Sequence, residues 1–126
     1  MSGFSFDSNI IIDALAGFIQ ARTEIDRATD FGATAWISRV VWIEVMSKGE
    51  GDSLRRAETL LSGFGIDEVD AEIGRRAAAL RRERGRLRAM DAIILATAQI
   101  RGRVLITRNT KDFPAEMPGI RVPYLL

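Results

Sequence analysis

The chain has 126 residues, of which 47% are hydrophobic, and its 18 Lys and Arg residues nearly balance 17 Asp and Glu residues. It contains no cysteine and no histidine, which excludes disulfides, thiolate or imidazole metal sites and catalysis by a histidine base. This length and composition predict one domain, residues 1–126, around a single core. Because the sequence has neither a signal-peptide pattern nor a run of 18 apolar residues, we expect a cytoplasmic protein without a membrane segment.

Strand and helix signals alternate along the chain. A short strand is expected at residues 3–6, and a helix over 8–19 follows it, with Asp7 or Ser8 as the N-cap. The later elements are, in order, a strand at 34–38, helices at 39–49 and 53–62, a strand at 64–69, a helix at 70–85, a helix through Asp91 to Ile100, a strand at 104–107 and an edge strand within 119–126. No two strands are joined by a tight hairpin, so the pattern predicts an α/β fold with a parallel sheet of about four to five strands, covered on both faces.

Polar side chains follow two of the expected strands at the point where each strand ends. Asp7 comes directly after the first strand. Thr107, Asn109 and Asp112 come at or just after the end of the strand "VLIT". Because the carboxyl ends of parallel strands meet at one edge of a sheet, we expect these two groups to be neighbours in the fold.

Two further acids lie in apolar helices. Glu44 is surrounded by apolar residues in "VVWIEVM", and Asp91 begins the apolar run in "RAMDAIILATAQ". An unpaired buried carboxylate costs several kcal/mol. Each of these acids therefore needs a compensating partner.

Every one of the four acids has a purely structural alternative. Asp7 could serve only as a helix cap, and Glu44 could form a buried ion pair with Arg39. Asp91 could favour the N-terminus of its helix electrostatically, and Asp112 could be a turn residue. A single bound divalent cation explains all four positions together, because it reverses the repulsion between clustered carboxylates. Since only oxygen ligands are offered, the expected ion is a hard one, Mg²⁺ or Mn²⁺.

Charge is divided unevenly along the chain. Residues 1–74 hold 6 basic and 13 acidic residues, a balance of −7, whereas residues 75–126 hold 12 and 4, a balance of +8. Seven arginines lie within residues 75–88. Some of them are expected to contact a nucleic-acid backbone with salt-dependent affinity. The alternative is a solvated helix face, or a surface that docks an acidic partner.

The segments "FDSN", "ISRVVWIEV", "RAMDAIILATA" and "LITRNTKDF" resemble, in this order, the motifs of the PIN-domain ribonucleases. They are similar in particular to the VapC toxins of bacterial type II toxin–antitoxin pairs. The resemblance extends from residue 4 to residue 113 without a large insertion. It implies a three-layer α/β/α sandwich and an endoribonuclease that cleaves RNA phosphodiester bonds with a water activated by Mg²⁺ or Mn²⁺.

The resemblance also assigns roles by motif position. The implied catalytic acids are Asp7, Glu44, Asp91 and Asp112. Of these, Asp7 and Asp91 are the implied metal ligands, and the division of labour between Asn109 and Asp112 stays open. The residues implied to support the acids are Ser8, Asn9, Thr107 and Asn109.

Partners follow from the same resemblance. Relatives usually form homodimers and are silenced by a small antitoxin whose C-terminal segment lies in the active-site groove. The arginines expected to contact RNA are Arg81, Arg82, Arg86, Arg88 and Arg108. The rival hypothesis is a non-catalytic PIN-like module that binds RNA or protein, in which the acids are structural; it predicts poor Mg²⁺ binding.

Overall fold

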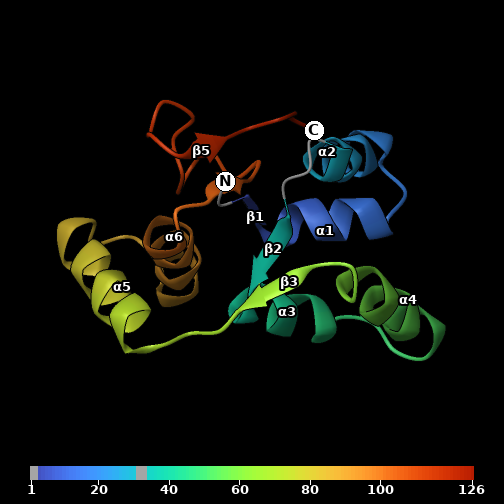
Figure 1. The fold of residues 1–126 in the computed structure, drawn as a ribbon, viewed down its shortest axis with the longest axis horizontal. Helices are drawn as coiled ribbons and strands as arrows, with labels where there is room; N and C mark the ends of the chain where they lie inside the picture. The colour runs from blue at the N-terminus through green and yellow to red at the C-terminus, as the bar shows by residue number, and fades with distance from the viewer. Residues whose placement is uncertain (1–2, 31–33) are drawn as a thin grey trace.

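The computed structural model describes residues 3–30 and 34–126 (Figure 1). Its elements alternate much as the sequence pattern predicts. They are β1 (Phe4–Phe6), α1 (Ser8–Leu15), α2 (Ile19–Asp30), β2 (Ala35–Ser38), α3 (Arg39–Met46), α4 (Asp52–Leu61), β3 (Gly65–Asp67), α5 (Ala71–Glu83), α6 (Ala89–Arg101), β4 (Val104–Ile106) and β5 (Ile120–Arg121). Within the described ranges, no helix is both long enough and apolar enough to cross a membrane.

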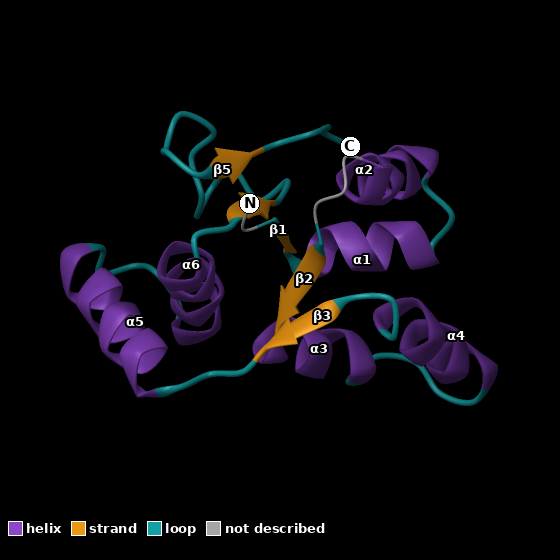
Figure 2. Cartoon of the chain, viewed as in Figure 1, coloured by secondary structure: helices purple, strands orange, loops and turns teal. Residues whose placement is uncertain are grey.

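The five strands form one sheet in the order β3-β2-β1-β4-β5, and every neighbouring pair is parallel. Helices α5 and α6 lie together on one side of this sheet, and α1 to α4 lie on the other (Figure 2). The predicted α/β/α architecture is therefore confirmed. Strands β1 and β4 are adjacent at the centre, with Phe6 opposite Ile106. The residues that follow these two strands consequently emerge side by side at the carboxyl edge of the sheet.

Short polar side chains begin the helices as their positions predict. The Asp7 side chain caps α1, the Ser38 hydroxyl accepts a hydrogen bond from the Val40 N–H (3.2 Å), and Asp70 Oδ1 accepts one from the Ile73 N–H (2.9 Å). Each cap satisfies a backbone donor that the first helical turn leaves without an intrahelical partner.

The expectation of one helix over residues 8–19 is wrong. Helix α1 ends at Leu15, and Gly17 adopts a φ of +92°, in the left-handed region that glycine enters without a steric penalty. The chain then turns and starts α2 at Ile19. This second helix was not expected from the sequence, because charged and polar residues dominate it.

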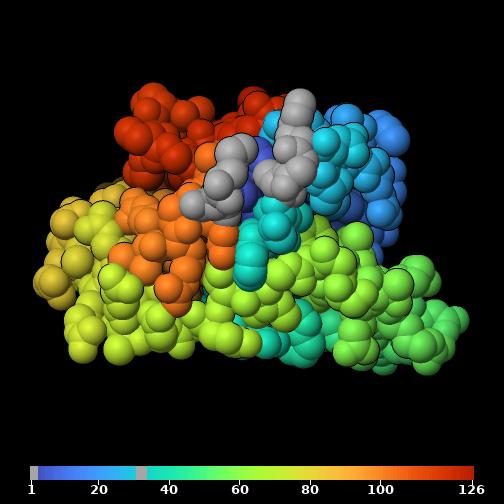
Figure 3. Space-filling model, in the orientation of Figure 1, coloured from blue at the N-terminus to red at the C-terminus, as the bar shows by residue number. Residues whose placement is uncertain are grey.

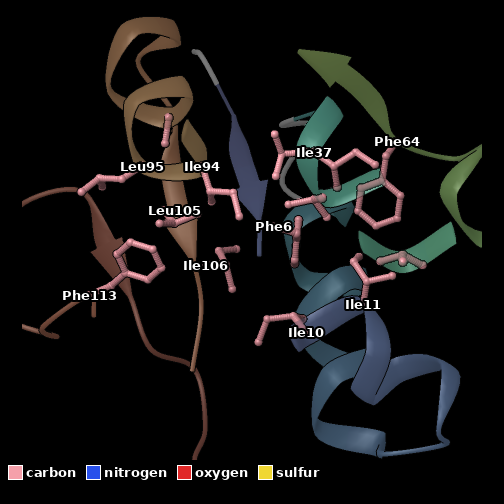
Figure 4. Packing of buried hydrophobic residues seen from close by; sticks show 14 of the residues in the cluster. Phe6, Ile10, Ile11, Ile37, Phe64, Ile94, Leu95, Leu105, Ile106 and Phe113 are labelled. Carbon is pink, nitrogen blue, oxygen red and sulfur yellow. The ribbon is translucent and has the colours of Figure 1, made fainter. Parts of the chain in front are cut away.

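The core lies between the sheet and the helices on both faces (Figure 4). It includes fully buried Phe6, Ile106 and Phe113, and the Phe6 ring packs edge-on against Phe64 with centroids 5.5 Å apart. Burying a side chain of this size stabilises the fold by about 1.5–3 kcal/mol. This packing holds strands β1 and β4 at the centre of the core.

The C-terminal segment lies on the surface, beside α2 (Figure 3).

Candidate active site

Asp7 lies at the carboxyl end of β1 and is 3% exposed. Its Oδ1 accepts a hydrogen bond from the Ser8 N–H (2.8 Å), and its Oδ2 accepts one from the Thr107 hydroxyl (2.7 Å). The Asn9 amide nitrogen is a longer donor to Oδ2, at 3.3 Å. Asp7 is therefore a helix cap, as one alternative held, but Thr107, the residue directly after β4, also fixes its second oxygen. The ends of β1 and β4 therefore lie next to each other, as the sequence predicted.

Three of the four predicted acids line one cavity of about 400 Å³ at this edge, which we call the carboxylate pocket. Asp7 comes from the end of β1, Glu44 from α3 and Asp91 from the first turn of α6. Its other lining residues are Ser8, Asn9, Arg88, Arg108, Asn109, Thr110 and Lys111. The topology thus gathers acids that are far apart in the sequence.

Two oxygens of the carboxylate pocket have no hydrogen-bond partner among the described residues. Glu44 Oε1 and Asp91 Oδ2 are buried and accept no hydrogen bond from any described residue. Arg88 Nε approaches Asp91 Oδ2 to 3.4 Å as an ion pair without hydrogen-bond alignment, and the Arg88 side chain is 80% exposed. Since a buried acceptor without a donor costs about 1–3 kcal/mol, these oxygens are suited to an external cation or donor.

The alternative pairing of Glu44 with Arg39 is wrong. The Arg39 guanidinium makes two hydrogen bonds to Glu68, at 2.9 and 2.5 Å, and lies over the Trp42 ring. Glu44 itself is half-buried rather than enclosed. Its charge therefore faces the carboxylate pocket without a dedicated arginine.

The site's electrostatics follow from burial without compensation. Burial, together with the charges of Asp91 and Glu44, raises the pKa of Asp7 to about 6, and the hydrogen bonds from Thr107 and Ser8 oppose this rise. The pKa of Asp91 is also raised, first by burial and then by the charge of Asp112. Mutual repulsion of this kind is the penalty that a divalent cation reverses.

The donor set fits a hard divalent ion that retains part of its water shell. Within residues 3–30 and 34–126, no three acids stand close enough together to enclose a metal ion by themselves. Mg²⁺ does not require such a cage, because it commonly binds through one or two carboxylates and keeps several waters. The pocket offers such an ion two buried oxygens that accept no hydrogen bond from the described residues. The ion would also stabilise the charged form of Asp7, which burial disfavours.

Asn109 and Asp112 occupy different positions relative to the pocket. Asn109 lines it, and its backbone N–H donates to the Thr107 hydroxyl (3.0 Å). The Asn109 amide nitrogen donates to Asp112 Oδ2 (3.0 Å), and the Asp112 N–H donates back to Asn109 Oδ1 (3.3 Å). Asp112 lines a neighbouring cavity. It also interacts directly with Asp91, because its charge and a side-chain hydrogen bond both raise the pKa of the Asp91 carboxyl.

The five arginines expected to contact RNA are not equivalent. Arg86 and Arg88 line the neighbouring cavity, and Arg82 is exposed away from both cavities. Arg81 donates to the Leu87 carbonyl (3.1 Å) and so holds the loop between α5 and α6. Arg108 lines the carboxylate pocket, but its guanidinium is bound elsewhere.

Asp13 and Tyr124 are the residues that bind Arg108, and sequence reasoning missed both. Arg108 makes two hydrogen bonds to the Asp13 carboxylate, at 2.6 and 2.9 Å, and the Tyr124 hydroxyl donates to the same carboxylate at 2.8 Å. A signal was available, because Asp13 interrupts the apolar run "IIIDAL". A buried carboxylate within an apolar run requires a compensating cation or hydrogen-bond donor.

A parallel α/β domain with carboxylates gathered at the carboxyl edge of its sheet defines a PIN-like class of protein. The family model described as PIN domain matches residues 5–115. The chain belongs to the PIN-domain family. The resemblance predicted from the four motifs is thereby confirmed.

Solved structures give the same result. A chain of a toxin–antitoxin complex from Klebsiella pneumoniae shares 40% identity, with a TM-score of 0.86 and coverage of 98% of this chain and 99% of that chain. The fold is also shared with VapBC2 from Rickettsia felis bound to a promoter DNA fragment (20% identity, TM-score 0.79, coverage 93% and 94%). FitAcB from Neisseria gonorrhoeae is similar to the same degree (20%, 0.77, coverage 98% and 99%). A comparison with curated proteins gives no significant match.

Proposed function

We propose that this chain is a metal-dependent endoribonuclease and the toxin of a VapBC-type toxin–antitoxin pair. The observation that carries the proposal is the carboxylate pocket, which Asp7, Glu44 and Asp91 line together and in which two buried oxygens accept no hydrogen bond from the described residues. Membership of the PIN-domain family supports nuclease chemistry. The 40% identity to a chain of a toxin–antitoxin complex, over nearly the whole of both chains, supports the biological role.

Asp7 and Asp91 would hold Mg²⁺ or Mn²⁺. Such an ion supplies Lewis-acid stabilisation of the phosphate charge and lowers the pKa of an attacking water. Thr107 and Ser8 orient the two oxygens of Asp7, so that this carboxylate is already in place. Glu44 offers its partnerless oxygen to a proton released in the pocket. Asp112, whose charge acts directly on Asp91, is the second candidate to accept that proton, and no protein nucleophile is needed.

The proposal extends to assembly and regulation. Residues 1–126 would act as one domain in the cytoplasm, form a homodimer and cleave RNA until an antitoxin occupies the active-site groove. The similar chain from Klebsiella pneumoniae belongs to a toxin–antitoxin complex, which supports a protein partner. The rival, a non-catalytic PIN-like module, keeps the same acids but predicts no metal-dependent cleavage.

Cleavage of single-stranded RNA by the purified protein with Mg²⁺ or Mn²⁺ tests the proposal. Asp91→Asn should lower the cleavage rate by at least about 100-fold, because several kcal/mol of transition-state stabilisation depend on the metal. Asp26→Asn makes the same chemical change at an exposed position of α2 and should leave the rate unchanged. Equal cutting by wild type and Asp91→Asn would indicate a contaminating nuclease. Metal binding without cleavage would favour the non-catalytic module.

A further inference from the structure

A second cavity, of about 770 Å³, adjoins the carboxylate pocket. It lies between the loop that joins α5 to α6 and the segment that follows β4, and it shares Arg88, Asn109 and Lys111 with the pocket. We call it the basic groove, because its charged lining consists of four cations and one acid. These residues are Arg84, Arg86, Arg88, Lys111 and Asp112.

The positive charge of the basic groove is largely uncommitted. Arg86 and Lys111 are exposed, and among the described residues no acidic side chain lies within 4.0 Å of either cation. Asp112, the one acid among the described lining residues, forms no ion pair with either cation. The groove therefore presents cations that the fold itself does not use.

Arg84 gives the groove a fixed donor. Its Nη2 donates to the backbone carbonyl of Asp112, which ties the α5–α6 loop to the segment after β4. Its Nη1 is buried and has no hydrogen-bond partner among the described residues. A buried guanidinium nitrogen without an acceptor is costly, and a phosphate oxygen would satisfy it.

The rim formed by Arg108 is different. There the cation is neutralised by Asp13, with Tyr124 bound to the same carboxylate. Among the described lining residues, the cations without a neutralising acid thus lie on the side of the carboxylate pocket that adjoins the basic groove. A polyanion in the carboxylate pocket would be attracted by the cations of the basic groove. On the side of Arg108 it would face a guanidinium already bound to Asp13.

We propose that the basic groove binds the phosphate backbone of a single-stranded RNA on one side of the scissile bond. The inference rests on the proposed function, since it places the substrate of the same site. The strand would pass Arg88 at the pocket and continue over Arg86 and Lys111. The planar guanidinium of arginine and the ammonium group of lysine both bind phosphate oxygens. No aromatic side chain is found among the described residues that line the groove. Contact is therefore with the backbone, and the groove does not select sequence by base stacking.

An acidic protein segment is the competing occupant. RNA is favoured because the groove is continuous with the carboxylate pocket through three shared residues. A strand whose phosphate is being cut there must place its next phosphates against an adjoining surface, and the charged side of that surface is the basic groove.

Binding without metal tests the proposal independently of cleavage. A fluorescein-labelled single-stranded RNA of about a dozen nucleotides is titrated in EDTA, and fluorescence anisotropy is followed at several salt concentrations. At about 0.1 M salt, Arg86→Ala and Lys111→Ala should each weaken binding roughly fivefold and reduce the slope of log K against log[salt] by about 0.7. Arg75→Ala removes the same charge from an exposed position of α5 outside the groove and should change little. Both groove side chains are exposed, so the variants should fold, which thermal melting verifies.

Two results would overturn the proposal. One is unchanged affinity and slope in both groove variants, or an equal loss in Arg75→Ala, which would mean that only net charge matters. The other is a labelled oligoglutamate that binds as tightly as the RNA and loses as much affinity in the variants, which would assign the groove to an acidic protein. If the binding assay contradicts the groove proposal, the proposed nuclease function can still be tested by the cleavage assay with Asp91→Asn. If the protein cleaves no RNA, the binding assay still tests the groove.

Discussion

Two sets of buried acids in this molecule lie in opposite electrostatic situations. In the first set, Asp13, Glu24 and Asp67 each accept two hydrogen bonds from one guanidinium, at 2.6–3.1 Å. Their partners are, in the same order, Arg108, Arg121 and Arg103. Burial alone would raise the pKa of Asp13 and Glu24, but the arginine hydrogen bonds outweigh it and lower the pKa of both.

The second set is the carboxylate pocket. Burial raises the pKa of Asp7 and Asp91. Among the described residues, the one guanidinium that forms an ion pair with either acid is that of Arg88, whose side chain is 80% exposed. Both sets are buried, so burial does not distinguish a structural acid from a functional one. The difference is the source of the cation: the chain supplies it for the first set, and the environment must supply it for the second.

The same substitution in the two sets should have opposite effects on stability. Asp67→Asn breaks an ion pair whose side chains are 5% and 10% exposed, and should lower the free energy of unfolding by about 3 kcal/mol. Urea denaturation measures this loss, with the exposed Asp26→Asn as the neutral reference. A loss below about 0.5 kcal/mol would show that the paired acids are dispensable, and the comparison would fail.

Asp7→Asn, in contrast, should stabilise the metal-free protein by about 1–2 kcal/mol at pH 7. The folded-state pKa of Asp7, about 6, lies above its ordinary value of 3.8, so the wild type loses stability as pH rises through this window. Asparagine carries no charge and escapes that loss. The advantage should be absent below about pH 4 and complete above about pH 6. Destabilisation at pH 7 comparable to that of Asp67→Asn would mean that Asp7 is only a structural cap.

The raised pKa of Asp7 should also make metal binding depend on pH. Protons compete with the ion for Asp7, so the affinity for Mn²⁺ should fall about tenfold between pH 7 and pH 5. Titration of the metal-free protein with Mn²⁺, followed by electron paramagnetic resonance, measures this. An affinity that stays constant down to pH 5 would indicate ligands with an ordinary carboxyl pKa, and would remove Asp7 from the site.

Most of the fold could be predicted from local signals. Apolar runs, caps and turn residues located the strands and the later helices, because each of these features acts within a few residues. The break after Leu15 was missed because Ile19 continues the apolar spacing, and only the left-handed φ of Gly17 reveals the turn. Helix α2 was missed because charged and polar residues dominate it, and its buried face includes Glu24, which is paired both with Arg27 in the same helix and with Arg121, 97 residues away.

The candidate site was predictable to the extent that topology alone brings residues together. Parallel strands that end at one edge were enough to place Asp7 beside Thr107. Ion-pair partners were not predictable in the same way, since they depend on side-chain reach between distant elements. Arg39 therefore contacts Glu68 rather than Glu44, and Arg108 is held by Asp13 rather than left for RNA.

The hydrogen bond from Thr107 to Asp7 spans 100 residues of sequence, and this separation sets the order of assembly. A protein leaves the ribosome with its N-terminal segment first, so β1 and Asp7 emerge long before β4 supplies the neighbouring strand and the hydroxyl. A growing or truncated chain that stops short of β4 holds its first acid but not the completed centre. Under the proposed function, an unfinished copy therefore has no cleavage activity before β4 has been synthesised.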